Sequence, residues 1–240
     1  LMREKSTELS EVKTIIHLGA CSSTTETDED YLDDNNFLYT KEACEWALEN
    51  NARFVYASSA ATYGDGTIGM DDKEESIEKF QPLNLYGWSK HKFDLLAKKQ
   101  GWFDKITGLK YFNVYGPGQY GDSPYSTAIA AWCDKVHNKL PLRSDGDGTQ
   151  SRDLVYVDDV VSANLAAATR EEKFTGQAYN IGSSTTITNN EILEKFKNKF
   201  DGVQVRNAAW RPGDVKNTLA DIESAKEDFG WFPVVRLEEG

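Results

Sequence analysis

One stretch of this chain constrains its fold more than any other. A helix-like segment at residues 85–100 lies between two strand-like segments that each end in small or polar residues. The first, residues 53–64, is apolar up to Ala57 and continues into hydroxyl residues that include Ser59. The second, residues 108–118, ends in a loop rich in glycine and proline. In open α/β sheets, ligands bind at the carboxyl ends of the strands, so we expect a site where these two segments end.

The rest of the chain continues this alternation of strands and helices. Helical patterns cover residues 30–50, 85–100, 127–138, 157–168 and 189–199. Strand patterns cover residues 14–18, 54–57, 107–112, 153–155 and 178–181. Strands that alternate with helices predict a mainly parallel sheet covered by helices.

The helical segment carries two residues whose spacing suits proton transfer. Tyr86 and Lys90 are four residues apart, so they lie on one face of a helix. A free tyrosine has a pKa of about 10, and a neighbouring cation lowers that pKa. A phenol adjusted in this way acts as a general acid or base near neutral pH. The same spacing also fits an ordinary amphipathic helix, and the flanking strands favour the catalytic interpretation by placing Ser59 and Asn113 around the same cleft.

Charge and hydropathy exclude several classes of partner. The chain has 240 residues, with 27 basic and 39 acidic side chains and a net charge of −12. This balance disfavours nucleic acids and anionic membranes as partners. There is no 18-residue apolar run and no recognisable signal peptide, so we expect a protein without a membrane segment.

The candidate metal ligands are few and lack metal-binding spacing. They are scattered along the chain: Cys21, Cys44, Cys133, His17, His91 and His137. An odd number of cysteines without a paired pattern is typical of a reducing compartment, so we expect a cytoplasmic protein without a metal site. His17 lies inside an apolar strand pattern, where packing is a commoner role than catalysis.

Several motifs, in this order, resemble the extended short-chain dehydrogenase/reductases of the NAD-dependent nucleotide-sugar epimerase/dehydratase family. The resemblance runs from about Thr14 to Gly240. The motifs that carry it are His17-Leu18-Gly19-Ala20-Cys21-Ser22-Ser23-Thr24-Thr25-Glu26, the strand ending at Ser59, Tyr86 with Lys90, Tyr111-Phe112-Asn113-Val114-Tyr115-Gly116-Pro117, Ser151-Arg152-Asp153-Leu154-Val155-Tyr156-Val157-Asp158-Asp159-Val160 and Tyr179-Asn180-Ile181-Gly182.

The resemblance implies a Rossmann-like, mainly parallel α/β sheet with a smaller C-terminal α/β substrate-binding domain. Residues 1–118 would form the remaining part of an NAD(P)-binding domain, with the catalytic Tyr and Lys. Residues 119–240 would mostly bind the nucleotide sugar, with some segments returning to the first domain. The family's Gly-x-x-Gly-x-x-Gly phosphate-binding turn does not occur in this sequence. We therefore expect an N-terminally truncated member that lacks the first strands of the sheet.

The resemblance also assigns roles to individual residues. The catalytic residues would be Ser59, Tyr86 and Lys90. The residues binding NAD or NADP would be Leu18, Gly19, Ala20, Cys21, Asn35, Asn36, Tyr86, Lys90 and Val114. The residues binding a nucleotide-diphospho-sugar would be Ser59, Asn113, Arg152 and Arg211. The two arginines suit a diphosphate because a guanidinium makes paired, charge-assisted hydrogen bonds.

The implied reaction is epimerisation through a transient keto sugar, with two substrate classes left open. The segments 21–26 and 56–64 resemble the ADP-glycero-manno-heptose 6-epimerase branch, but residues 116–134 lack the lysine that this branch uses as a second base. The segments 118–126 and 211–214 resemble the UDP-hexose 4-epimerase branch. The alternative from another class is a truncated, non-catalytic nucleotide-sugar-binding remnant.

The family's usual assembly is a homodimer through a four-helix bundle. Two helical segments, residues 30–50 and 85–100, would form it. Their apolar residues are Leu38, Trp46, Leu48, Trp88, Phe93 and Leu96. The same residues would equally suit packing within one subunit.

Overall fold

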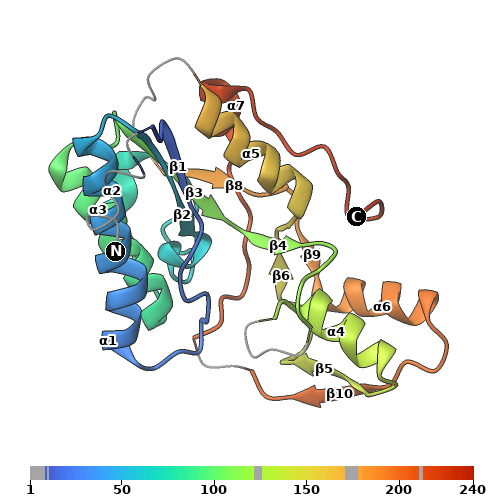
Figure 1. The fold of residues 1–240 in the computed structure, drawn as a ribbon. Coiled ribbons are helices and arrows are strands. Elements are labelled where there is room, and N and C mark those ends of the chain that lie inside the picture. The colour runs from blue at the N-terminus through green and yellow to red at the C-terminus, as the bar shows by residue number, and fades with distance from the viewer. Residues whose placement is uncertain (1–8, 10, 122–125, 171–177, 211–212) are drawn as a thin grey trace.

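Four parallel strands form the main sheet of the computed structural model, which describes residues 9, 11–121, 126–170, 178–210 and 213–240. The strands are β1 (Thr14–His17), β2 (Arg53–Ser59), β3 (Ile106–Tyr111) and β8 (Ala178–Ile181), hydrogen-bonded in the order β1-β2-β3-β8 (Figure 1). Register pairs Thr14 with Arg53, Phe54 with Ile106 and Gly108 with Ala178. The predicted α/β fold with a parallel sheet is confirmed.

Helices cover both faces of this sheet (Figure 1). One face carries α3 (Leu85–Gln100) and a helical run made of α1 (Glu29–Leu32), a π-helical turn (Asp33–Leu38) and α2 (Tyr39–Glu49). The other face carries α5 (Val157–Thr169), and α7 (Glu223–Phe229) packs against β8. Two 3₁₀ turns, Ala60–Tyr63 and Glu74–Lys79, link β2 to α3.

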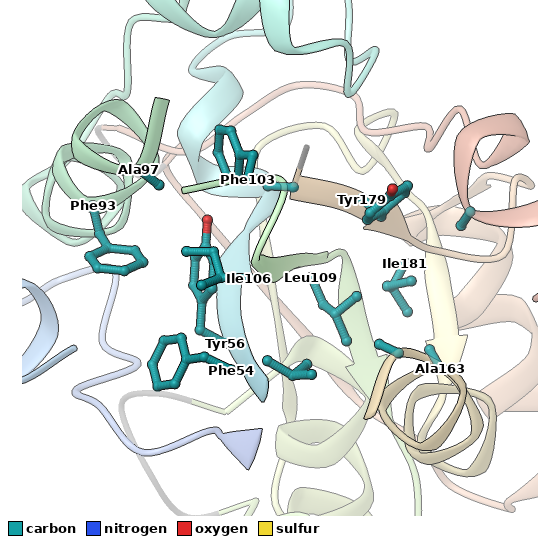
Figure 2. Close-up of a cluster of buried hydrophobic side chains, with 14 of the residues drawn as sticks. Phe54, Tyr56, Phe93, Ala97, Phe103, Ile106, Leu109, Ala163, Tyr179 and Ile181 are labelled. Atoms are coloured by element: carbon teal, nitrogen blue, oxygen red, sulfur yellow. The ribbon is translucent and has the colours of Figure 1, made fainter. Parts of the chain in front are cut away.

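The core fills the space between the sheet and its helices (Figure 2). Phe54 and Tyr56 of β2 face Phe93 of α3, and the rings of Tyr56 and Phe93 meet edge to face at 4.7 Å. Leu109 points to the opposite side, toward the helix that carries Ala163. This alternation follows from the two-residue period of a strand, which sends successive side chains to opposite faces.

Gly108 makes room for the Tyr56 ring at the centre of the sheet. A Cβ atom at this position would lie 2.6 Å from the Tyr56 Oη atom and 2.7 Å from the Ala178 Cβ atom. Both distances are shorter than van der Waals contact. Only glycine therefore lets three strands pack around this tyrosine without a shift.

A second, smaller lobe follows the sheet (Figure 1, lower right). It contains α4 (Ala128–His137), α6 (Asn189–Lys199) and the parallel pair β5 (Leu142–Asp145) and β10 (Val205–Ala208). Two short pairings join it to the main sheet, β4 (Asn113–Tyr115) with β7 (Leu154–Tyr156) and β6 (Ser151–Arg152) with β9 (Ile187–Thr188). The lobe has its own apolar cluster: Tyr115, Trp132, Leu142, Leu154, Ile192, Leu193 and Phe196.

The structure corrects several predictions made from the sequence. The helix predicted over residues 30–50 is interrupted by the π-helical turn, and the strand predicted at 153–155 begins at Leu154. Of the residues considered for a helix bundle, Trp46 and Phe93 are 3% and 1% exposed and follow the alternative left open from the sequence, packing within one subunit, whereas Leu38 is 49% exposed. Within the described ranges, no helix has both the length and the apolar character needed to cross a membrane.

Candidate active site

A cleft of about 780 Å³ lies between the carboxyl end of the main sheet and the smaller lobe. One wall comes from the sheet and α3. Its predicted site residues are Leu18, Ala20, Cys21, Ser59, Tyr86, Lys90, Asn113 and Val114. The other wall comes from the lobe and includes Arg152. Nine of the residues predicted from the sequence therefore surround one cavity.

Helix α3 begins at this cleft and approaches β2 closely. Asn84 ends the preceding loop, and its side-chain Oδ1 atom accepts a hydrogen bond of 2.8 Å from the Gly87 N–H. This cap fixes where the helix starts. A Cβ atom at Gly87 would lie 2.7 Å from the Ala61 carbonyl oxygen. The glycine thus lets the first turn of α3, which carries Tyr86, pack against the turn that follows Ser59.

Lys90 is held one helical turn after Tyr86. Its side chain is buried at the cleft wall, where Nζ donates a hydrogen bond of 2.9 Å to the Ala57 carbonyl oxygen. An ammonium group has three N–H donors, and this is the only bond that Nζ makes within the described ranges. Burial lowers the pKa of Lys90 to about 8, against the opposing effect of the Asp94 carboxylate. The remaining donors are available to a ligand in the cleft.

Burial dominates the titration of Tyr86. Desolvation raises the pKa of this phenol above its usual value, while a hydrogen bond with Ser59 acts in the opposite direction. The sequence predicted a pKa lowered by Lys90, and that prediction is wrong for the structure described here. The physical reason is that removing the phenolate from water destabilises it more than the hydrogen bond with Ser59 stabilises it. The phenol is therefore neutral at pH 7 and able to donate a proton.

The loop after β1 is fixed by Asn36, which lies in the π-helical turn. The Asn36 carboxamide accepts a hydrogen bond of 2.8 Å from the Cys21 N–H and donates one of 3.0 Å to the Cys21 carbonyl oxygen. It also donates to Ser89 Oγ at 2.9 Å. Because these bonds engage the whole carboxamide, the structure places Asn36 as a link between the Cys21 loop and α3. The Asn35 side chain is exposed and donates to the Tyr31 carbonyl oxygen at 2.8 Å.

The lobe contributes a guanidinium group at the other wall. Arg152 Nη2 donates a hydrogen bond of 2.8 Å to Asp214 Oδ1, and Nη1 donates to the Ser151 and Lys216 carbonyl oxygens. The neighbouring Asp153 is fully buried and accepts backbone N–H bonds from Ser183, Ser184 and Ala220. Asp153 thus fixes the chain that presents Arg152. Arg211 lies outside the described residues.

Most of the lobe wall was not predicted from the sequence. The lining residues that the sequence patterns did not single out include Gln119, Trp132, Lys135, Arg143, Asp145 and Gln150. Lys135 and Trp132 lie on α4, whose amphipathic pattern is also that of an ordinary surface helix. Arg143 and Asp145 lie on β5, which is too short to give a strand pattern. Only the tertiary structure brings these segments to the cleft.

The chemistry of the sheet wall fits one end of a dinucleotide. Gly19 has open space where a Cβ atom would stand, so a ligand can approach the backbone after β1 closely. Lys90 and Tyr86 offer N–H and O–H groups to a ribose. The residues that would hold a nicotinamide riboside are therefore Leu18, Gly19, Ala20, Lys90 and Val114. The sequence contains no glycine-rich turn for the pyrophosphate.

Known proteins resemble this chain in sequence and in structure. The chain is 37% identical over 225 residues to an ADP-L-glycero-D-manno-heptose-6-epimerase of Nitratidesulfovibrio vulgaris, covering 91% of this chain and 69% of that protein. It is 41% identical over 188 residues to an enzyme of the same name from Fusobacterium nucleatum, covering 72% of this chain and 54% of that protein. The chain thus spans little more than half of the second relative.

A solved structure matches the whole fold. The UDP-glucose 4-epimerase of Thermotoga maritima, solved with UDP-glucose, superposes with a TM-score of 0.86 at 27% identity, covering 100% of this chain and 78% of that one. The family model described as "NAD dependent epimerase/dehydratase family" matches residues 2–182. This chain therefore belongs to the NAD-dependent epimerase/dehydratase family.

Proposed function

We propose that this chain is an NAD- or NADP-dependent nucleotide-sugar epimerase that acts through a transient keto sugar, with an ADP-heptose as its substrate. One observation carries the proposal: Ser59, Tyr86 and Lys90 line one wall of a cleft whose opposite wall presents Arg152. This arrangement puts a proton-transfer group and a residue able to bind a diphosphate in the same cavity. The two heptose epimerases described above support the choice of sugar.

The chain's own residues supply proton transfer and position. Tyr86 must first lose its own proton to solvent; the resulting phenolate then accepts the proton of the reacting sugar hydroxyl as the C–H hydride leaves, so that a C=O bond forms. The same phenol returns the proton when hydride is added back to the opposite face. Ser59 hydrogen-bonds the reacting oxygen, and the Lys90 ammonium stabilises the phenolate. Bound NAD or NADP would supply the hydride acceptor for this reaction.

The lobe wall suits the diphosphate. Arg152 can offer its guanidinium in paired hydrogen bonds to phosphate oxygens, and Lys135 and Arg143 add positive charge to the same wall. Asp214 already holds Arg152 in place. A diphosphate would compete with this carboxylate for the guanidinium.

A UDP-hexose is the second candidate substrate. The Thermotoga maritima structure supports it over the full length of this chain. The segment 116–134 also contains no lysine or histidine for a second base. A 4-epimerase needs none, because the keto sugar turns over between the two hydride transfers. Lys135 follows this segment directly and lines the cleft, so it is the residue to test under the heptose proposal.

We also propose a homodimer, formed through the face of the main sheet that α3 and the α1–α2 run cover. Tyr31 and Leu38 are 47% and 49% exposed on the outer side of the α1–α2 run. Light scattering of the purified chain should give twice its 26.9 kDa mass, and Leu38→Glu should return it to monomer. A monomeric wild-type chain would contradict the dimer.

The deciding experiment uses the purified chain with either NAD or NADP. ADP-glycero-manno-heptose, UDP-glucose and UDP-N-acetylglucosamine are each incubated in D₂O, and the C4 and C6 epimers are separated and analysed by NMR. Inversion without deuterium at the inverted carbon is expected, since the hydride returns to its own carbon. Binding of nucleotide sugar with neither inversion nor cofactor binding would instead support the non-catalytic remnant.

A further inference from the structure

A buried ion pair lies behind the proposed catalytic residues. Asp94 of α3 and Lys110 of β3 are 0% and 1% exposed, and Lys110 Nζ lies 2.6 Å from Asp94 Oδ2. Asp94 also accepts hydrogen bonds from Tyr56 Oη at 2.7 Å and from Ser58 Oγ at 2.8 Å. Lys110 donates a further bond of 2.7 Å to Thr62 Oγ1. Such a pair is a costly way to stabilise a core, because apolar residues of the same size often stabilise it as well.

The pair belongs to a regular set of contacts between α3 and β2. Tyr86, Lys90 and Asp94 are spaced by four residues and lie along one side of the helix. Together they meet four different residues of the strand. Tyr86 bonds to Ser59, Lys90 donates to the Ala57 carbonyl oxygen, and Asp94 accepts from Ser58 and Tyr56. Asp94 therefore fixes the register of the helix that carries the two functional residues.

We propose that the Asp94–Lys110 ion pair is a positioning unit that sets both the register of α3 on β2 and the charge of Lys90. Asp94 is one helical turn from Lys90, and its carboxylate favours the ammonium form. Lys110 binds the same carboxylate at Oδ2 and so offsets part of the negative charge that Lys90 experiences. Asp94 thus favours the charged form of Lys90, and Lys110 weakens that effect.

Other groups that face Lys90 are few. On its own helix these are Tyr86 and Asp94. From the β1 side they are His17, whose pKa Lys90 itself lowers, and Cys21, which favours the charged lysine. Burial opposes the charge throughout. Asp94 is therefore the carboxylate that keeps Lys90 charged among the described residues, and Lys110 is the cation bound to it.

The test measures the titration of Lys90 without turnover. The full chain is acetylated briefly at a series of pH values, and labelling of Lys90 is quantified by mass spectrometry. Asp94→Asn is expected to move the labelling midpoint about one pH unit lower, because a nearby opposite charge is lost. Lys110→Gln, which keeps a hydrogen-bond donor to Asp94, is expected to move it in the other direction. The double variant should return near the wild-type midpoint.

Matched controls remove charges from exposed positions nearby. Lys99→Gln on the same helix and Asp104→Asn after it should leave the midpoint unchanged. Both positions are exposed. A pair with a purely structural role would lower the melting temperature in each single variant without opposite shifts. Shifts of the same sign, or none, would overturn the proposal. If Asp94→Asn does not fold, Lys110→Gln and the neutral double variant still show whether the Lys90 labelling midpoint moves in the expected direction.

Only the last step, from Lys90 to turnover, rests on the proposed function. If the chain epimerises a nucleotide sugar, the high-pH decline of kcat/KM should follow the Lys90 midpoint in each variant. A midpoint that moves while this decline stays fixed would overturn that step alone. If no nucleotide sugar is epimerised, the labelling result still decides the role of the ion pair, so the two failures are distinguishable.

Discussion

The two walls of the cleft are built in different ways. The sheet wall is deeply buried: Ser59 and Lys90 are 9% and 6% exposed, and α3 meets β2 at three successive turns. The lobe wall is more open, with the Arg143 side chain 58% exposed and that of Lys135 35% exposed. It rests on pairs of short strands rather than on a sheet of four.

This difference corresponds to two physical tasks. Proton transfer requires heavy atoms at hydrogen-bond distance, so the groups that perform it need a rigid frame. Attraction between a guanidinium and a diphosphate falls off slowly with distance and tolerates small displacements. We infer that the sheet wall determines the chemistry and that the lobe wall determines which nucleotide sugar is bound. Each prediction below perturbs one wall and asks whether the other is unaffected.

The largest effect is expected on the sheet wall. Tyr86→Phe removes the proton-transfer group and should lower kcat by about 10²–10⁴-fold, with little change in substrate affinity. Initial rates and calorimetric titration measure the two quantities separately. Tyr120→Phe, at a side chain that is 78% exposed, is the control and should retain activity. A large loss of affinity in Tyr86→Phe would show that the two walls are not separable.

On the lobe wall, Arg152→Ala should weaken nucleotide-sugar binding by about 10–100-fold and leave kcat nearly unchanged, since charge-assisted hydrogen bonds are lost. Asp214→Asn should instead strengthen nucleotide-sugar binding, because the carboxylate no longer competes for the Arg152 guanidinium. Isothermal titration measures both. Arg206→Ala, at an exposed position on β10, is the matched control. Equal affinities for wild type and Arg152→Ala would remove Arg152 from the site.

The rigidity of the sheet wall can be tested at its centre. Gly108→Ala should lower the free energy of unfolding by about 1–3 kcal/mol, because the new methyl group overlaps Tyr56 and Ala178. Urea denaturation measures the loss. Adding Ala178→Gly removes one of the two overlaps and should recover part of the stability. No loss in Gly108→Ala would show that this wall adjusts more easily than its packing indicates.

A pH effect is also expected from the two histidines of the sheet region. Burial lowers the pKa of His17 and of His91 to about 4. The unfolded chain, with a histidine pKa near 6.5, therefore binds protons more readily, and stability falls as pH drops from about 6.5 toward 4. The melting temperature should decline over this interval, by roughly 2–4 °C for each kcal/mol lost. His17→Gln with His91→Phe should flatten the curve, whereas His137→Gln, at an exposed position, should leave it unchanged.

Sequence patterns were most informative where burial and periodicity coincide. The segment around β2 and α3 has both, so the parallel sheet and the positions of Ser59, Tyr86 and Lys90 in one cleft could be predicted. Lys135 and Arg143 could not, because each lies in a short or amphipathic element whose neighbours are distant in the chain. The spacing of two residues along the sequence also does not show how far their side chains are removed from water. For that reason the predicted direction of the Tyr86 pKa was wrong, although Tyr86 does line the cleft.

The π-helical turn at Asp33–Leu38 limits how this protein can be redesigned. Such a turn adds one residue to an otherwise regular helix. A designer who deleted that residue to obtain an ideal α-helix would rotate the following residues by about 100° and change which side chain faces the core. Asn36 would then no longer reach Cys21 and Ser89, which it links at present. A change that improves local helix geometry would therefore release the loop after β1 from the helix that carries Tyr86.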